Sequence, residues 1–497
     1  MLAKLQKRAV DQSSFDRGDV SFILISSALV LFMVPGLMFL YSGLSRRKNA
    51  LSVIWVCFFG SLVTTITWYI WGYSLAFSPT ATNGFIGNLE FGGHHNALGD
   101  PSPGSPLIPT LLYSLFQMEF CCVTVAILMG AIAERGRVMP AMLFVFVWVT
   151  LVYAPVACWV WNINGWAFKW GVADYAGGGP VEIGSGVGGL AYSWVIGRRH
   201  ERELVNFRPH NVTLVTLGTF MLWFGWIGFN AGSAFGANLR AVYAALNTCL
   251  CASVGGITWC LLDYRIQKKY TMIGLCSGTI AGLVAATPSS GFIPLWASVA
   301  LGFVASAICN YGTKIKHLIR IDDALDLFAE HALAGIVGLL FNGLFAKNEI
   351  IALDDVNTAI NGGWLDRNFK QLYIQFAYVI ACCAYVFAIT ALIAKVFCLI
   401  PFLNLRASDH AELIGIDDDQ IGEFVQDFVE VRRAYDEWAP AAATSSQPEK
   451  PEKFNGTHTP VAAGDRHGFP DTNVNVHTPS NINPNHHDGL TLPMSEK

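Results

Sequence analysis

Charged residues are scarce in this sequence. Asp, Glu, Lys and Arg together make up 14% of its 497 residues, whereas hydrophobic residues make up 53%. Soluble domains usually contain about 25% charged residues. The deficit excludes an ordinary water-soluble domain and indicates that lipid surrounds most of the chain. The net charge of −4 is also too small to indicate an electrostatic partner such as nucleic acid.

The sequence also lacks the motifs of disulfide-rich, metal-binding and catalytic proteins. Its cysteines, from Cys57 to Cys398, all lie inside apolar segments, and none forms a CxxC pair. We interpret them as polarisable packing residues. Because no nucleotide-binding loop or catalytic triad is present, the sequence predicts neither an enzyme nor a bound metal or other cofactor.

Long apolar segments are what the sequence has instead. A membrane-spanning helix needs roughly 17–25 mostly apolar residues. Eleven segments fit this description: 20–44, 51–77, 107–133, 139–161, 180–196, 212–234, 241–262, 272–287, 292–311, 324–344 and 371–400. The fifth and eighth are short, and the eleventh is long enough to tilt. The sequence therefore predicts an all-α, polytopic membrane domain over residues 20–400.

Lys and Arg in the loops between these segments predict the orientation, because such residues concentrate in cytoplasmic loops. One set of alternate loops holds fifteen: Arg46, Arg47, Lys48, Arg135, Arg137, Arg198, Arg199, Arg202, Arg208, Arg265, Lys268, Lys269, Lys314, Lys316 and Arg320. The opposite set holds five: Lys169, Arg240, Lys347, Arg367 and Lys370. The sequence thus predicts a cytoplasmic C-terminus and an extracellular N-terminal tail over residues 1–19.

The composition changes after the last apolar segment. Residues 401–438 mix charged with apolar residues, and the apolar ones recur at helical spacing at Ile421, Phe424, Val425, Phe428 and Tyr435. This spacing predicts a short amphipathic helix in a cytoplasmic regulatory segment. Residues 439–497 are rich in Pro, Asn, Thr and His, with few large apolar residues, and are predicted to be a disordered cytoplasmic tail.

The carboxylate of Glu182 lies inside an apolar segment that contains no Lys or Arg. Glu182 belongs to the fifth segment, VEIGSGVGGL, and charged groups at membrane depth usually serve a site or pathway. The tenth segment contains EHALAGIVGL, and aligning Glu182 with His331 places glycines four and seven residues after each. Halves of five segments would have opposite topologies, as in the inverted repeats of many transporters. Chance similarity between glycine-rich helices is the alternative.

Five stretches of the sequence carry a family resemblance: FQMEFCCVTVAILMGAIAERGR, YAPVACWVWNINGWAF, DYAGGGPVEI, WFGWIGFNAGSAFGAN and RIDDALDLFAEHALAGIVG. Together they resemble the signature segments of the ammonium transporter (Amt/Mep/Rh) family, in order, from about Gly18 to Arg433. The resemblance implies eleven helices per subunit, arranged as two inverted five-helix repeats plus a long eleventh helix. It also implies a homotrimer in the plasma membrane, with a pore within each subunit.

The resemblance implies an outer substrate site. Phe120, Trp161 and Ser233 resemble residues that bind ammonium or methylammonium, and Phe120 and Phe229 resemble a stacked pair that closes the pore below. Aromatic faces hold small cations by cation–π attraction, worth about 2 kcal/mol or more when desolvated. A serine hydroxyl can accept an N–H hydrogen, which potassium lacks.

The resemblance also assigns residues further along the pore. Trp226 resembles a pore-lining tryptophan, and Asp174 resembles an aspartate that supports the outer site without touching the substrate. His331 resembles the second of two pore histidines. Glu182 stands where the first histidine is usual, an exchange also found in the fungal Mep branch. The implied function is recruitment and deprotonation of ammonium, with ammonia and the proton conducted separately past Glu182 and His331.

Simpler interpretations exist for each of these residues. Without the resemblance, the aromatic residues would be packing residues and Ser233 a helix-packing serine. Asp174 would cap the following helix, His331 would be a buried histidine satisfied by a neighbour, and Glu182 would belong to a salt bridge. Three further carboxylates have no predicted role: Glu119, Glu134 and Glu330.

The sequence is also compatible with two other functions. One is an ammonium sensor that signals through its cytoplasmic tail, on which a kinase or other regulatory protein would act. The other is a neutral gas channel, as proposed for the Rhesus branch, although the GGGP and GFNAGS surroundings resemble the Amt/Mep side.

Overall fold

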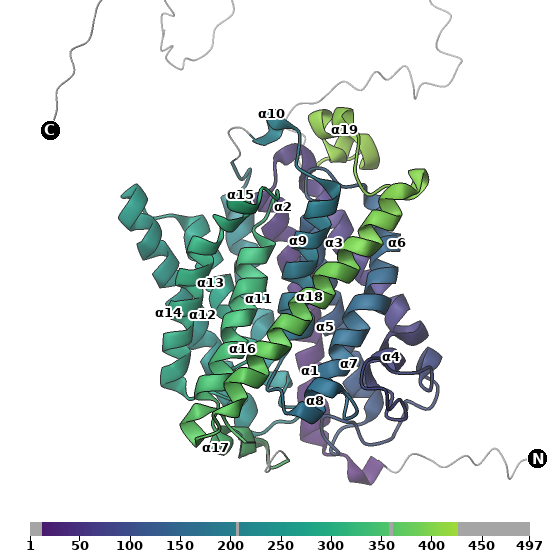
Figure 1. Cartoon of the computed structure of the whole chain (residues 1–497), viewed down its shortest axis with the longest axis vertical. Helices are drawn as coiled ribbons and strands as arrows, with labels where there is room; N and C mark the ends of the chain where they lie inside the picture. Colours follow the sequence, from purple (N-terminus) through teal and green to yellow (C-terminus); the bar gives the residue numbers. More distant parts are fainter. Residues whose placement is uncertain (1–11, 205–207, 357–360, 426–497) are drawn as a thin grey trace, which may run out of the picture. The chain divides into compact units, whose positions relative to one another are not determined.

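The computed structural model describes residues 12–204, 208–356 and 361–425. Over these ranges the regular secondary structure is helical, and β-structure is limited to two isolated bridges (Figure 1). The described chain thus has the all-α fold that the sequence predicts. The predicted disordered tail over residues 439–497 lies outside the described residues, as does most of the N-terminal tail.

The α-helices occupy the predicted apolar segments and several of the loops between them. The first ten are α1 (Arg17–Leu31), α2 (Met33–Leu44), α3 (Ala50–Thr67), α4 (Tyr73–Phe77), α5 (Thr110–Met129), α6 (Val138–Trp148), α7 (Ala154–Trp161), α8 (Trp166–Trp170), α9 (Gly184–Ile196) and α10 (Glu201–Leu204). The others within the described ranges are α11 (Val212–Gly232), α12 (Leu239–Gln267), α13 (Met272–Ala286), α14 (Leu295–Gly312), α15 (Ile315–Ile319), α16 (Ala334–Phe345), α17 (Asn348–Ile351), α18 (Lys370–Leu399) and α19 (Asp409–Ile414).

Several helices continue through π-helical turns, which often mark functional sites when they interrupt α-helices. These turns are η4 (Trp68–Gly72), η7 (Val149–Tyr153), η8 (Gly178–Ile183), η9 (Phe328–Leu333) and η13 (Asp417–Ile421). Short 3-10 turns are η2 (Gln12–Ser14), η3 (Arg47–Asn49), η5 (Gly92–His94), η6 (Gly130–Ile132), η10 (Ala352–Asp354), η11 (Trp364–Asp366) and η12 (Pro401–Leu403). Because η8 directly precedes α9 and η9 directly precedes α16, the helices within the fifth and tenth predicted segments both begin with a π-helical turn.

Nine helical segments within the described ranges are long and apolar enough to cross a membrane. The predicted segments outside these nine are the two that the sequence already shows to be short. Helix α13 has only 15 residues, and the segment formed by η8 and α9 is rich in glycine. Length and composition therefore establish nine candidate spans, and a total of eleven remains a prediction.

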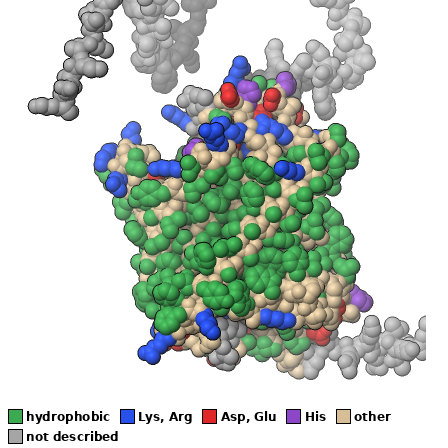
Figure 2. All heavy atoms as spheres, in the orientation of Figure 1, with side chains coloured by type: hydrophobic (Ala, Val, Ile, Leu, Met, Phe, Trp, Pro, Cys, Tyr) green, Lys and Arg blue, Asp and Glu red, His purple; other side chains and the backbone are tan. Residues whose placement is uncertain are grey.

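The helices pack into one bundle in which both halves of the sequence contribute to the interior. Helix α11 packs against α1 and α2, helix α5 packs against α3, and α18 packs against α9 and α16. Figure 1 shows α18 running obliquely past α9 and α16. Figure 2 shows hydrophobic side chains over the middle of the visible face and most Lys and Arg side chains at the end that carries α10, α15 and α19. All the cysteines are free thiols and none is exposed, as expected for packing residues.

The segment after α18 differs from the predicted amphipathic helix. It forms two short helices, α19 and η13, and each ends at a glycine with positive φ, namely Gly415 (+117°) and Gly422 (+77°). Positive φ is accessible to glycine and commonly ends a helix. The predicted helix is therefore wrong over its described part: Ile421 ends η13, and Phe424 and Val425 follow it outside any helix. Phe428 and Tyr435 lie outside the described residues.

Candidate functional site

Two phenylalanine rings from different helices stack in the interior of the bundle. Phe120 of α5 and Phe229 of α11 have ring centroids 3.8 Å apart and planes inclined by 16°. Both side chains are buried. Rings at this separation are in van der Waals contact, so no water or ion fits between them.

The other two residues of the predicted outer site lie beside this stack. The Trp161 ring, at the end of α7, lies edge-on to Phe120 with centroids 6.1 Å apart. The Ser233 hydroxyl donates a hydrogen bond to the backbone carbonyl of Phe229 at 2.9 Å. Because the hydroxyl hydrogen is committed to that carbonyl, the oxygen lone pairs remain able to accept an N–H hydrogen. The structure thus brings Phe120, Trp161, Phe229 and Ser233 together.

Trp226 lies on the next turn of α11, toward the middle of that helix. Its ring centroid is 5.7 Å from that of Phe229, and its indole N–H donates to the Thr287 hydroxyl at 2.9 Å. The backbone carbonyl of Thr287 accepts a hydrogen bond from the N–H of Ala176 at 3.1 Å. Thr287 therefore fixes the indole relative to the chain that leads into η8. The sequence analysis did not identify Thr287, because nothing in the sequence distinguishes it apart from its position at the end of α13.

Asp174 binds the backbone at the start of η8. Its carboxylate accepts hydrogen bonds from the N–H groups of Gly177, Gly178 and Gly179 at 3.0, 2.6 and 2.8 Å. Its own carbonyl accepts the Trp161 indole N–H at 3.3 Å. Asp174 thus satisfies N–H groups that a helix start leaves without partners, and it connects Trp161 to the turn that carries Glu182.

Glu182 and His331 meet inside the bundle. The Nδ1 atom of His331 lies 3.0 Å from Oε2 of Glu182, although the two residues are 149 positions apart. The Glu182 side chain is fully buried and that of His331 is 3% exposed. The other carboxylate oxygen, Oε1, has no hydrogen-bond partner within the described part of the chain. Each residue lies in a π-helical turn, Glu182 in η8 and His331 in η9.

Glycines let these two turns approach each other closely. A Cβ atom at Gly335, four residues after His331, would lie 2.6 Å from the Cβ of Glu182. A Cβ at Gly186, four residues after Glu182, would overlap the backbone nitrogen of Ala332 and lie 2.9 Å from its Cβ. The contact is therefore reciprocal, because each glycine accommodates the other segment's turn. Small residues permit such close packing between helices.

The three carboxylates without a predicted role lie in different places. Glu134 accepts ion pairs from Arg46 and Arg199 at 3.1 and 2.7 Å, at the end of the bundle that carries α10. Glu119 is buried in α5, and its Oε2 atom has no partner among the described residues. Glu330 is buried and directly precedes His331. Only Glu134 could have been recognised, since a carboxylate at the end of an apolar segment close to several arginines suggests an ion pair.

The fold and this arrangement define a helical membrane protein with a buried carboxylate–imidazole pair and an aromatic stack. Residues 21–426 match the family described as "Ammonium Transporter Family". The chain is 55% identical to ammonium transporter MEP3 of Saccharomyces cerevisiae over 426 residues, covering 86% of this chain and 87% of that protein. It is 50% identical to ammonium transporter 2 of Schizosaccharomyces pombe over 451 residues, covering 90% and 88%.

Solved structures show the same fold. The crystal structure of Candida albicans Mep2 superposes with a TM-score of 0.78 at 42% identity, covering 84% of this chain and 92% of that one. The chain belongs to the ammonium transporter family. Because its relatives are named as transporters, the prediction that it is not an enzyme is confirmed.

Proposed function

We propose that this protein transports ammonium across the plasma membrane, binding the cation at an outer aromatic site and conducting ammonia and a proton separately inward. The observation that carries the proposal is the order of the buried groups. The stack of Phe120 and Phe229 adjoins Trp161 and Ser233, and the backbone of Asp174 connects this site to the turn that carries Glu182. A binding site, a closure and a proton-carrying pair thus follow one another.

The outer site suits ammonium better than potassium. Phe120 and Trp161 present aromatic rings to a cation, and Ser233 supplies an acceptor for one of its hydrogens. Potassium gains the cation–π attraction but has no hydrogen to donate. Asp174 keeps its carboxylate on the backbone of η8, so it supports the site without contacting the substrate.

The closed stack below the site accounts for deprotonation. A bare ammonium ion would lose its hydration in passing between apolar rings, at a high free-energy cost. Ammonia avoids most of that cost because it is neutral. The ring of Phe120 or Phe229 has to rotate for passage, and Trp226 lines the path beyond.

Glu182 and His331 then carry the released proton. At 3.0 Å the carboxylate and the imidazole are close enough to share one proton and to pass it on. With Nδ1 donating to Glu182, the Nε2 atom of His331 stays available for proton exchange. We propose that Glu182 replaces the first pore histidine of the family, as in part of the fungal branch.

The wider architecture follows the family as well. We propose eleven spans in two inverted repeats plus α18, an extracellular N-terminus, and a homotrimer with one pore per subunit. The reciprocal packing of Gly186 and Gly335 supports the repeats, because the same device recurs at corresponding positions of both halves. The gathering of Lys and Arg at the end with α10, α15 and α19 supports a cytoplasmic C-terminus (Figure 2).

Uptake of methylammonium tests the function and the outer site together. Cells without their own ammonium transporters should take up methylammonium when they produce this protein. Rising potassium concentration should inhibit that uptake only slightly. Trp161→Leu removes a cation–π partner worth about 1–2 kcal/mol, so half-maximal uptake should need roughly tenfold more methylammonium. The measurement is initial uptake against methylammonium concentration, with and without potassium. Absence of uptake by the wild type would contradict the function, and an unchanged half-maximal concentration in the variant would contradict the site.

The segment after α18 is fixed to the ends of several spans, which supports a regulatory role. The Asp417 carboxylate accepts the N–H groups of Leu51 and Ser52 at 2.9 and 2.7 Å, at the start of α3. The Lys48 ammonium group donates to the carbonyls of Glu412 and Leu413 at 2.9 and 2.8 Å. The segment thus satisfies N–H groups that would otherwise lack partners at the helix start.

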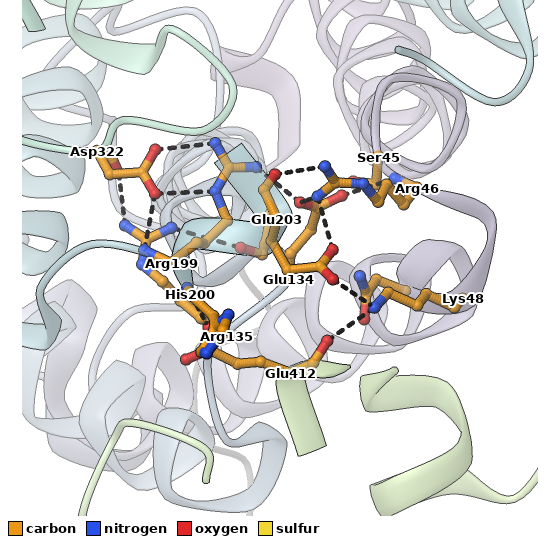
Figure 3. A network of polar contacts seen from close by, with 12 residues as sticks. Ser45, Arg46, Lys48, Glu134, Arg135, Arg199, His200, Glu203, Asp322 and Glu412 are labelled. Atoms are coloured by element: carbon orange, nitrogen blue, oxygen red, sulfur yellow. Dashed lines mark hydrogen bonds and ion pairs between the residues drawn. The ribbon is translucent and has the colours of Figure 1, made fainter. Parts of the chain in front are cut away.

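Glu412 extends this contact to the end of α9. Its carboxylate pairs with Arg406 and accepts the N–H of His200 at 2.8 Å. Figure 3 shows Glu412 beside Lys48 and the neighbouring ion pairs of Glu134. We propose that a kinase or another regulatory protein acts on the tail beyond this segment, where Thr459 and Thr478 precede prolines outside the described residues. If the protein is an ammonium sensor, a variant that no longer transports ammonium should still signal.

Truncation tests the regulatory role. Cutting the chain after Leu405 removes Glu412 and Asp417 and leaves the start of α3 uncapped, so transport should fall by about fivefold or more. Cutting after Ala439 keeps every described contact and should leave transport nearly unchanged. Methylammonium uptake, corrected for surface expression, distinguishes the two. Equal transport by both truncations and the full-length protein would show that the segment has no regulatory role.

A further inference from the structure

A cavity of about 650 Å³ lies at the end of the bundle that carries α10 and α15. Its walls come from the loop after α9 and from α15 with the loop that follows it. Five basic side chains line it: Arg198, Arg199, Lys316, His317 and Arg320. The proposed transport mechanism uses none of them.

The acidic residues of the lining are already neutralised. Asp322 accepts the backbone N–H of Arg199 at 2.9 Å and forms two side-chain hydrogen bonds with its guanidinium at 2.8 Å. Burial acts to raise the pKa of Asp322, but the bonds from Arg199 and the charge of Arg135 outweigh it and hold that pKa well below its ordinary value. Asp326 pairs with Lys316 at 2.7 Å.

Three of the five basic side chains that line the cavity have no acidic partner in the described part of the chain. Arg198, His317 and Arg320 have exposed side chains, and within the described ranges none of the three forms an ion pair. Both carboxylates of the lining are occupied, so the cavity carries a net positive charge. Clustered cations repel one another and attract an anion.

The backbone holds the two arginines in place. The carbonyl of Arg198 accepts a hydrogen bond from Arg406 at 2.6 Å. Arg320 ends α15 with a φ of +57°, and its N–H donates to the carbonyl of Lys316. The ion pair between Arg199 and Asp322 joins the two walls. A site whose backbone is ordered in advance loses less entropy when a ligand binds.

We propose that this cavity binds a phosphate monoester. A guanidinium group matches the oxygens of a phosphate with two parallel hydrogen bonds, and two arginines and a histidine can balance its double negative charge. A volume of about 650 Å³ exceeds that of a phosphate group and leaves room for the molecule to which it is esterified.

The phosphate can come from a membrane lipid or from a soluble ester. The neighbouring side chains favour a lipid headgroup. Leu318 is 83% exposed and Ile319 is 42% exposed, and both lie between His317 and Arg320 in the sequence. Basic and apolar side chains exposed together at the end of a span are typical of the bilayer interface, where basic pockets bind phosphoinositide headgroups.

Ligand-dependent thermal unfolding of the purified full-length protein in detergent tests the proposal. The probes are dioctanoyl phosphatidylinositol 4-phosphate, dioctanoyl phosphatidylinositol as the matched lipid without a monoester, and soluble inositol 1,4-bisphosphate. A ligand that binds the native state raises the unfolding temperature in a saturable way. We expect the 4-phosphate lipid to stabilise the protein and the unphosphorylated lipid to have little effect.

Substitution of the two arginines locates the site. Arg198→Gln with Arg320→Gln should weaken binding of the phosphate lipid by roughly a hundredfold, because two charge-assisted contacts are lost. Arg265→Gln with Lys269→Gln removes the same charge from the exposed end of α12 and the bend that follows it, and should change nothing. Both affected arginines are exposed, so the unliganded variant should unfold at the wild-type temperature.

The outcomes separate the sources and can refute the site. If inositol 1,4-bisphosphate binds as tightly as the phosphate lipid and depends on the same arginines, the phosphate monoester site stands and its ligand is soluble. Equal affinity of the two double variants would overturn the proposal. So would a lack of binding by every small phosphate probe, including the case in which a phosphothreonine peptide containing Thr459 binds instead.

Discussion

Replacing Glu182 by glutamine should reduce ammonium-driven current roughly tenfold or more, since a positioned proton-transfer group typically contributes at least that much. Glutamine has nearly the size of glutamate and can still accept a hydrogen bond from the Nδ1 of His331, 3.0 Å from the present carboxylate. It cannot take up or release a proton. The pair would then retain its geometry and lose its function.

A second substitution at the same position separates proton transfer from geometry. Glu182→His restores a titratable group and should retain transport, with a pH dependence different from that of the wild type because an imidazole replaces a carboxylate. The measurement is current against pH in proteoliposomes for the wild type and both variants. Glu349 is the exposed partner of Lys347 and takes no part in the proposed pore. Glu349→Gln is therefore the control and should behave like the wild type.

The result that would refute this role is wild-type current in Glu182→Gln across the whole pH range, at equal protein content. Glu182 would then be a packing residue whose carboxyl group plays no part in transport. Loss of folded, assembled protein in Glu182→Gln would instead show that the carboxylate is needed for folding or assembly.

Gly186→Ala should destabilise the folded protein by about 2 kcal/mol or more and abolish most transport, because overpacking of a tight core typically costs 1–3 kcal/mol. The new methyl group would overlap the backbone nitrogen of Ala332. A backbone atom in η9 cannot move alone, so α9 and η9 would have to separate. The neighbouring contact between Glu182 and His331 would lengthen with them.

The same helix offers a matched control. A Cβ at Gly184 would have its nearest neighbour, the carbonyl oxygen of Gly179, at 3.6 Å, which is ordinary van der Waals contact. Gly184→Ala makes the identical chemical change two residues away and should leave the unfolding temperature and the uptake rate close to those of the wild type. Similar behaviour of the two alanine variants would mean that the segments do not depend on this close approach.

The sequence by itself determined the class of protein and the number of apolar segments. A bilayer admits only helices or closed barrels, and a span needs a fixed length of apolar chain, so composition and segment length suffice. It also singled out Glu182, because a carboxylate in such a segment is costly wherever it faces. The predicted site residues came from a family resemblance that rests on a few short stretches, and their spacing alone would not have assigned them.

Only the tertiary structure decided which of these residues meet. Phe120 and Phe229 come from α5 and α11, and Glu182 and His331 come from turns 149 positions apart, so no local pattern reports their contact. The segment after α18 shows the same limit. Its apolar spacing predicts one helix, but Asp417 and Glu412 accept hydrogen bonds at the starts and ends of distant spans, and two glycines divide it into the short helices α19 and η13. Hydrogen bonds to those distant groups outweigh local helical preference, which is weak over so few residues.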